Sequence, residues 1–126
     1  MRQAVSFERK GSGRPLVVMH AGLAQDVIDE LATRFDVYAI AVSEGDEAEV
    51  KRGLEAARVE RPLLFGHGAG VTVACAVAGK RIPRGMVLCS EPREAVAVPL
   101  LVVTDTELIE VGRLVERVAA FDAPLQ

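Results

Sequence analysis

The sequence contains few aromatic side chains. Among its 126 residues there is no tryptophan, one tyrosine (Tyr38) and four phenylalanines. A folded core must therefore be built from aliphatic side chains, and half of the residues are hydrophobic, as in ordinary soluble globular proteins. The length predicts a single domain that spans residues 1–126.

Cysteine is scarce, and so are the marks of secretion and membrane insertion. Cys75 and Cys89 are too few for a disulfide framework, and this usage is typical of a reducing compartment. The first ten residues contain no apolar segment of a secretory signal. The longest uncharged stretch, Pro62–Gly79, is interrupted by four glycines and a histidine, which disfavours a membrane span. We therefore expect a cytoplasmic protein without membrane contact.

The sequence also lacks a concentration of charge of one sign. The net charge is −3, with acids and bases scattered along the chain, which disfavours nucleic acid as a partner. No group of histidine, cysteine, aspartate and glutamate has the spacing of metal ligands. We predict neither a metal nor a cofactor.

Short apolar runs alternate with longer amphipathic segments along the whole chain. This order predicts an α/β fold of three layers, with a mostly parallel sheet of five to six strands and helices on both faces. The predicted strands are Ala4–Glu8 (an edge strand, followed by a turn at Lys10–Arg14), Pro15–Met19, Asp36–Val42, Pro62–Phe65, Gly85–Cys89 and Pro99–Val103. The predicted helices are Leu23–Arg34 with Ala24 on its buried face, one after Ser43 that buries Val50, Leu54 and Ala57, Val71–Ala78, and Glu107–Phe121.

The connection between the last two predicted strands is unusually short. Only residues 91–97 join them, whereas parallel neighbours normally need a dozen or more connecting residues. Seven extended residues reach about 23 Å, barely enough to return along a short strand. Either the crossover is stretched and helix-free, or the last strand runs antiparallel.

Four segments, taken in chain order, resemble the α/β-hydrolase family. Residues 11–22 look like its early hairpin, buried strand and oxyanion loop, with Ala21 inserted between His20 and Gly22. Residues 61–78, which include Gly-His-Gly-Ala-Gly at 66–70, look like its nucleophile elbow and the following helix. Residues 82–90 and 98–105 are similar to the two later strands. The resemblance spans residues 4 to about 121 and implies a truncated α/β-hydrolase-like core without a cap, the helix between the last two strands, or the final strand.

The catalytic residues that the resemblance implies are incomplete. The elbow motif G-x-S-x-G carries its serine on a strained turn, and here Gly68 stands in that place. No histidine follows His67 to act as the base, and the acid would be Asp105 or Glu107, although Thr104 and Glu107 also fit a helix capping box. Because loss of the nucleophile or the base removes nearly all triad catalysis, we expect a pseudoenzyme that lacks serine-hydrolase activity.

A ligand is expected at the carboxyl ends of the strands, where open α/β sheets bind small molecules. The elbow frame favours a small acidic or carbonyl ligand, although the domain could instead act through protein contacts. We expect His67 to orient the elbow. A nucleophilic role for Cys89 lacks an evident base, and packing is the simpler interpretation. The residues predicted to contact the ligand are His20, Gly22, Leu23, Gly68, Ala69, Cys89 and Ser90.

Two other functions fit the same residues. A lyase or another cofactor-free enzyme could use His20 or His67 as acid or base, with the elbow amides stabilising an oxyanion. Alternatively, the Gly66–Gly70 turn could bind a nucleotide, since Glu91 follows near the spacing of a ribose-binding acid. Apolar surface at the sheet edges, uncovered by a cap, also predicts a homodimer.

Overall fold

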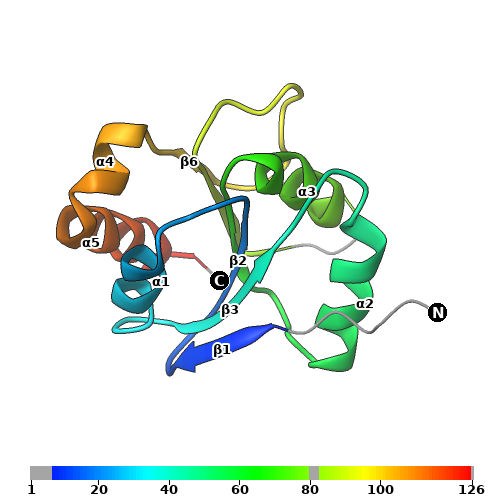
Figure 1. The fold of residues 1–126 in the computed structure, drawn as a ribbon, viewed down its shortest axis with the longest axis horizontal. Helices are drawn as coiled ribbons and strands as arrows, with labels where there is room; N and C mark the ends of the chain where they lie inside the picture. The colour runs from blue at the N-terminus through cyan, green and yellow to red at the C-terminus, as the bar shows by residue number, and fades with distance from the viewer. Residues whose placement is uncertain (1–6, 80–82, 126) are drawn as a thin grey trace.

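The computed structural model describes residues 7–79 and 83–125 (Figure 1). Within them, six strands form one sheet in the order β1-β3-β2-β4-β5-β6, in which β1 is antiparallel to β3 and every other pair is parallel. The prediction of a mostly parallel sheet is confirmed. The strands are β1 (Glu8–Gly11), β2 (Pro15–His20), β3 (Asp36–Ala41), β4 (Leu63–Gly66), β5 (Gly85–Leu88) and β6 (Leu100–Val102).

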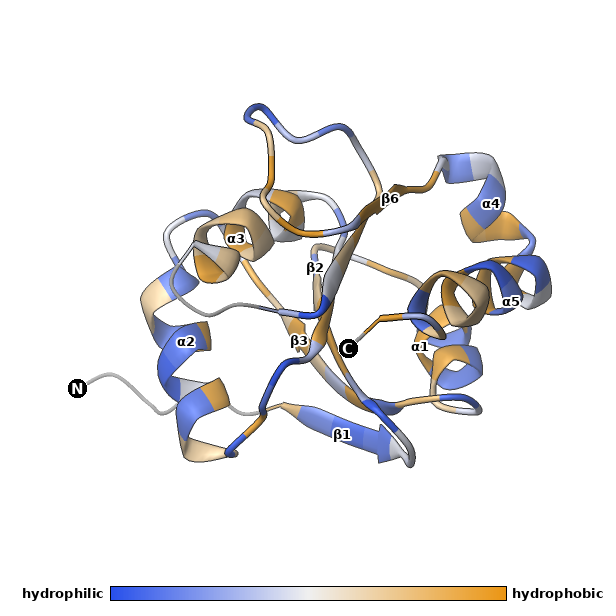
Figure 2. Cartoon of the chain, turned by 180° about the vertical axis from the view of Figure 1, so that it is seen from behind, coloured by the Kyte–Doolittle hydropathy of each residue, from blue (hydrophilic) through white to orange (hydrophobic). Residues whose placement is uncertain are grey.

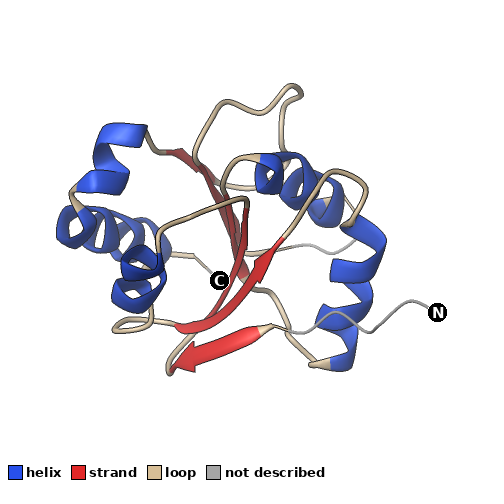
Figure 3. Cartoon of the chain, viewed as in Figure 1, coloured by secondary structure: helices blue, strands red, loops and turns tan. Residues whose placement is uncertain are grey.

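Helices cover both faces of the sheet, so the three-layer prediction is also confirmed (Figure 3). α1 (Gln25–Leu31) and α5 (Val111–Asp122) pack on one face, and α2 (Glu47–Ala56) and α3 (Ala69–Ala78) pack on the other; a short helix, α4 (Asp105–Ile109), precedes α5. Alternate residues of the central strands point into the two cores, and Figure 2 shows hydrophobic colouring on these strands but not on β1. No described helix is long and apolar enough to cross a membrane.

The first strand differs from its prediction. It begins at Glu8, where the predicted edge strand ended, and it runs to Gly11 inside the predicted turn. Residues 4–6 of the prediction lie outside the described residues. Gly11 ends the strand with φ +90°. It lies so near the backbone of Phe35 that an added Cβ would be 2.3 Å from the Phe35 carbonyl oxygen. The position of β1 is therefore determined by backbone pairing with β3 and not by alternation of polar and apolar residues.

The predicted helix bounds also need correction. The predicted helix Glu107–Phe121 is two helices, because the backbone at Glu110 turns out of the helical region (φ −91°, ψ 68°). The helix predicted at Leu23–Arg34 spans only Gln25–Leu31. Ala24 and Ala57 were predicted to be buried, but each is a cap residue and is exposed.

The connection to β6 is the helix-free crossover, since β6 runs parallel to β5. Both strands are shorter than predicted, and residues 89–99 are therefore free to make the return. In Figure 1 this segment forms the loop beside α3. The absence of a crossover helix leaves room between the loop and α3, which matters for the site.

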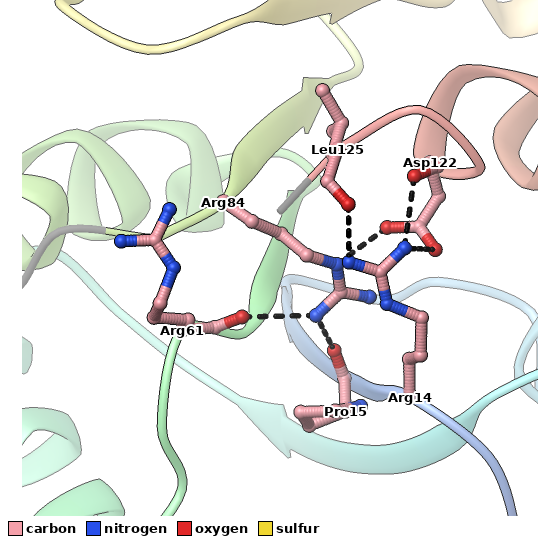
Figure 4. A network of polar contacts seen from close by, with 6 residues as sticks. All are labelled: Arg14, Pro15, Arg61, Arg84, Asp122 and Leu125. Carbon is pink, nitrogen blue, oxygen red and sulfur yellow. Dashed lines mark hydrogen bonds and ion pairs between the residues drawn. The ribbon is translucent and has the colours of Figure 1, made fainter.

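A buried ion pair anchors α5 at the amino-terminal ends of the parallel strands (Figure 4). Arg84, just before β5, donates from Nε to Asp122 Oδ1 (2.5 Å) and from Nη1 to the carbonyls of Pro15 (2.8 Å) and Arg61 (3.0 Å). Arg14 adds a contact to Asp122 Oδ2 at 3.2 Å. This network joins the starts of β2, β4 and β5 to the last helix.

Candidate functional site

The elbow lies between β4 and α3 and is centred on Gly68. His67 N–H continues the ladder to β2 by donating to the Met19 carbonyl (3.0 Å). Gly68 then adopts φ 59° and ψ −128°, a conformation that side chains rarely tolerate, and α3 begins at Ala69. The amide of Gly70 donates to the His67 carbonyl (2.9 Å) and closes the turn. The sharp strand-turn-helix predicted from the glycine pattern is therefore present.

Ala21 lies directly over this glycine. A Cβ added at Gly68 would be 3.0 Å from the Ala21 Cβ, closer than ordinary van der Waals contact. The Ala21 amide donates to the His67 carbonyl (3.2 Å), which fixes the loop to the elbow. The alanine inserted between His20 and Gly22 thus occupies space that a side chain at position 68 would need.

We expect Gly68→Ser to lower the free energy of unfolding by about 1–3 kcal/mol, from backbone strain and crowding. Ala21→Gly should recover part of this loss, because it removes the crowding methyl group; direct contacts couple by about 0.5–3 kcal/mol. Urea denaturation of the two single variants and the double variant measures the coupling.

Gly45→Ser is the matched control, since Gly45 also has positive φ (+96°) but no atom within 4 Å of its added Cβ. Ala21→Gly should not rescue Gly45→Ser. Equal rescue at both positions would contradict the crowding. Neither Gly68→Ser nor the double variant should gain esterase activity.

Three candidate side chains form a row along the carboxyl edge of the sheet. The ladders that pair Met19 with Gly66 and Gly66 with Leu88 place His67 between His20 on β2 and Cys89 after β5. The structure thus brings together residues that are far apart in the sequence.

Both histidines are partly buried. Burial, and secondarily the neighbouring His67, lowers the pKa of His20, and its Nδ1 accepts the Leu23 amide (3.3 Å). This lowered pKa favours the neutral imidazole of His20 at pH 7. The Nδ1 atom of His67 is buried without a hydrogen-bond partner among the described residues, so an elbow-orienting hydrogen bond from this atom is absent there.

Cys89 is unsuited to act as a nucleophile. Burial, with smaller effects from the charges of Asp105 and Glu107, raises the pKa of its thiol to about 12. Because the thiolate is the reactive form, the protonated thiol at neutral pH favours a packing role. Cys89 accordingly packs against the core beneath α1 and α5.

The two candidate acids belong to the start of α4. Asp105 is exposed, and Glu107 forms an ion pair with Arg117. Thr104 Oγ1 accepts the Glu107 amide (3.3 Å), as a capping residue does. In the described part of the chain neither acid is hydrogen-bonded to a histidine, so no acid–base pair is assembled, and no group of three or more potential metal ligands was found.

A hollow of about 640 Å³ opens beside the elbow, between α3 and residues 90–98. Of the predicted ligand residues, Gly68 and Ser90 line it, as does Glu91. The other five, His20, Gly22, Leu23, Ala69 and Cys89, do not line it. Gly22 is exposed, whereas the Leu23 side chain is buried in the core and its amide donates to His20 Nδ1.

Several residues on both sides of this hollow were not among the predicted ligand residues. Val71, Thr72 and Cys75 line it from α3, and Val96 and Val98 line it from the crossover. A signal was available, since the exposed Thr72 interrupts an otherwise apolar helix.

Comparison with solved structures identifies proteins of the α/β-hydrolase fold. An α/β-hydrolase-fold protein from Burkholderia ambifaria aligns with a TM-score of 0.57 and 20% identity, covering 72% of this chain and 41% of that one. The N-acyl homoserine lactonase AidH, as a serine-to-glycine mutant complexed with N-hexanoyl homoserine lactone, aligns with a TM-score of 0.55 and 14% identity, covering 70% and 43%. At these identities the likeness shows the fold alone, and this chain spans less than half of either structure. No family model matches the sequence, and no curated protein matches it.

Proposed function

Because the chain has an α/β-hydrolase-like core, we propose that it is a hydrolase-like domain without serine-hydrolase activity that binds a small carbonyl or acidic ligand beside Gly68. One observation carries the proposal: the elbow keeps its turn, has at its centre a glycine whose added Cβ would crowd Ala21, and opens on a hollow. The site therefore has a frame for binding but no hydroxyl for acyl transfer.

The polar end of the ligand is expected at the start of α3. The first amides of a helix have no partner within the helix and attract oxygen atoms that carry negative charge. Gly70 and Val71 donate their amides within the turn, whereas the Ala69 amide has no backbone acceptor among the described residues. A carbonyl or carboxylate oxygen of the ligand can accept a hydrogen bond from the Ala69 amide.

The rest of the ligand is expected to be aliphatic. Val71, Cys75, Val96 and Val98 give the hollow an apolar wall, and a helix of ten residues such as α3 is about 15 Å long. A ligand with a carbonyl group and a short aliphatic tail fits both the amide at the start of α3 and this apolar wall. The lactonase complexed with N-hexanoyl homoserine lactone supports an acyl compound of this kind as the probe.

Isothermal calorimetry with N-hexanoyl homoserine lactone and with hexanoate tests this proposal. Thr72→Arg places a large side chain in the hollow and should weaken binding about tenfold or more. Ala76→Arg is the control, because Ala76 is also exposed on α3 but does not line the hollow. The proposal would be contradicted if neither variant changed the binding of the acyl probes. It would also be contradicted if ATP or NAD gave a heat of binding and the acyl probes gave none.

A histidine-based enzyme is the second candidate. The observation that favours it is the adjacency of His67 to a neutral His20, since a neutral imidazole can accept a proton at pH 7. Turnover that persists unchanged in the His20→Ala/His67→Ala double variant would exclude it.

A further inference from the structure

The two edges of the sheet differ in chemistry. On β1, Glu8, Arg9 and Lys10 are exposed, and the two basic side chains pair with Asp36 (2.9 Å) and Asp29 (2.6 Å). Charged side chains of this kind protect an edge from pairing with another strand. On β6, the opposite edge, all three residues are apolar and half-buried.

The hydrogen bonds of β6 to β5 show which backbone groups of β6 have no partner among the described residues. Met86 donates to the Pro99 carbonyl (2.9 Å), and Val103 donates to the Leu88 carbonyl (2.8 Å). Because backbone groups alternate in direction along a strand, the N–H and C=O of Leu101 also face β5. The N–H and C=O groups of Leu100 and Val102, the residues on either side of Leu101, therefore point away from β5.

Apolar side chains continue from this edge onto both faces of the molecule. Leu100, Val96 and Val98 are half-buried against the core of α2 and α3, and Leu101 and Phe121 are half-buried against the core of α1 and α5. Figure 2 shows β6 coloured as hydrophobic, in contrast to the hydrophilic β1. The edge therefore offers apolar area as well as free backbone groups.

We infer that β6 pairs antiparallel with β6 of a second copy of this chain, about a twofold axis at Leu101, so that one sheet runs through both copies. In this register Leu100 lies opposite the partner's Val102 and exchanges both N–H···O bonds with it, and the two Leu101 residues form the central pair without hydrogen bonds. The match is self-complementary, as a twofold interface requires, and the three residues of β6 are all apolar.

Light scattering and amide hydrogen exchange test the interface together. At tens of micromolar the mass should be that of a dimer, and the Leu100 and Val102 amides should exchange about tenfold more slowly than at high dilution. The Leu101 and Val103 amides, which face β5, should be protected at both concentrations.

Val102→Lys should give a monomer, whereas Ile109→Lys should leave the dimer intact, because Ile109 is 81% exposed on α4 and lies off the strand. Circular dichroism shows whether each variant is folded, and the exchange experiment on the unchanged chain tests the interface without a variant. A monomeric mass overturns the inference. A dimer without protection of Leu100 and Val102, or their protection in a monomer, overturns it as well, because another interface or another segment would then be responsible.

Discussion

Gly70→Ala is expected to lower the free energy of unfolding by at least about 3 kcal/mol, a large fraction of the roughly 5–15 kcal/mol of an ordinary domain. A Cβ at this position would lie 1.8 Å from the Met19 carbonyl oxygen and 2.5 Å from its carbonyl carbon. These are backbone atoms of a central strand, so no side-chain rotation relieves the contact. Urea denaturation followed by circular dichroism measures the loss.

Gly79→Ala is the matched control at the other end of α3. Gly79 has helical dihedrals (φ −66°, ψ −18°), and its added Cβ would make only ordinary contacts, at 3.6 Å and 3.8 Å. Alanine there should be neutral or should stabilise by about 0.4–1 kcal/mol. Similar effects of the two substitutions would contradict the close packing of α3 on β2, which holds the elbow in place.

Asp122→Ala should lower the free energy of unfolding by about 3–5 kcal/mol, because it leaves the Arg84 guanidinium buried without its partner charge. The two side chains are only 5% and 2% exposed, so water does not replace the lost carboxylate. The substitution also removes the Arg14 contact. Thermal and urea unfolding at neutral pH both report the change.

Asp29→Ala provides the comparison with an exposed ion pair. Asp29 pairs with Lys10 at the surface, where both side chains are about half exposed, and such pairs contribute at most about 1 kcal/mol. Asp122→Asn tests the charge separately, since the amide oxygen can still accept from Arg84. If Asp122→Ala cost no more than Asp29→Ala, the network would not anchor α5.

Local patterns in the sequence predicted the elements that position the site. The apolar runs at Pro15–Met19 and Pro62–Phe65 correspond to β2 and β4, and the glycines at 66–70 correspond to the elbow. These features depend on neighbouring residues only. The same holds for Thr104, whose capping of α4 could be predicted from its spacing to Glu107.

Features that depend on distant residues could not be predicted. Nothing in the sequence pairs Arg84 with Asp122, because their contact requires the finished sheet and α5. Ala21 would crowd a side chain at position 68 only because the loops after β2 and β4 meet. The hollow likewise exists because a crossover that lacks a helix lies over α3, a consequence that only the three-dimensional arrangement reveals.

The most direct test of the central claim is intact-protein mass spectrometry after treatment with a fluorophosphonate probe, which modifies activated serine hydroxyls. The elbow offers only Gly68, and a side chain at that position would crowd Ala21. We predict no labelling of the natural chain, and none of the Gly68→Ser variant, because neither candidate acid is hydrogen-bonded to a histidine in the described part of the chain. Stoichiometric labelling of the natural chain at a serine would contradict the proposed absence of serine-hydrolase chemistry.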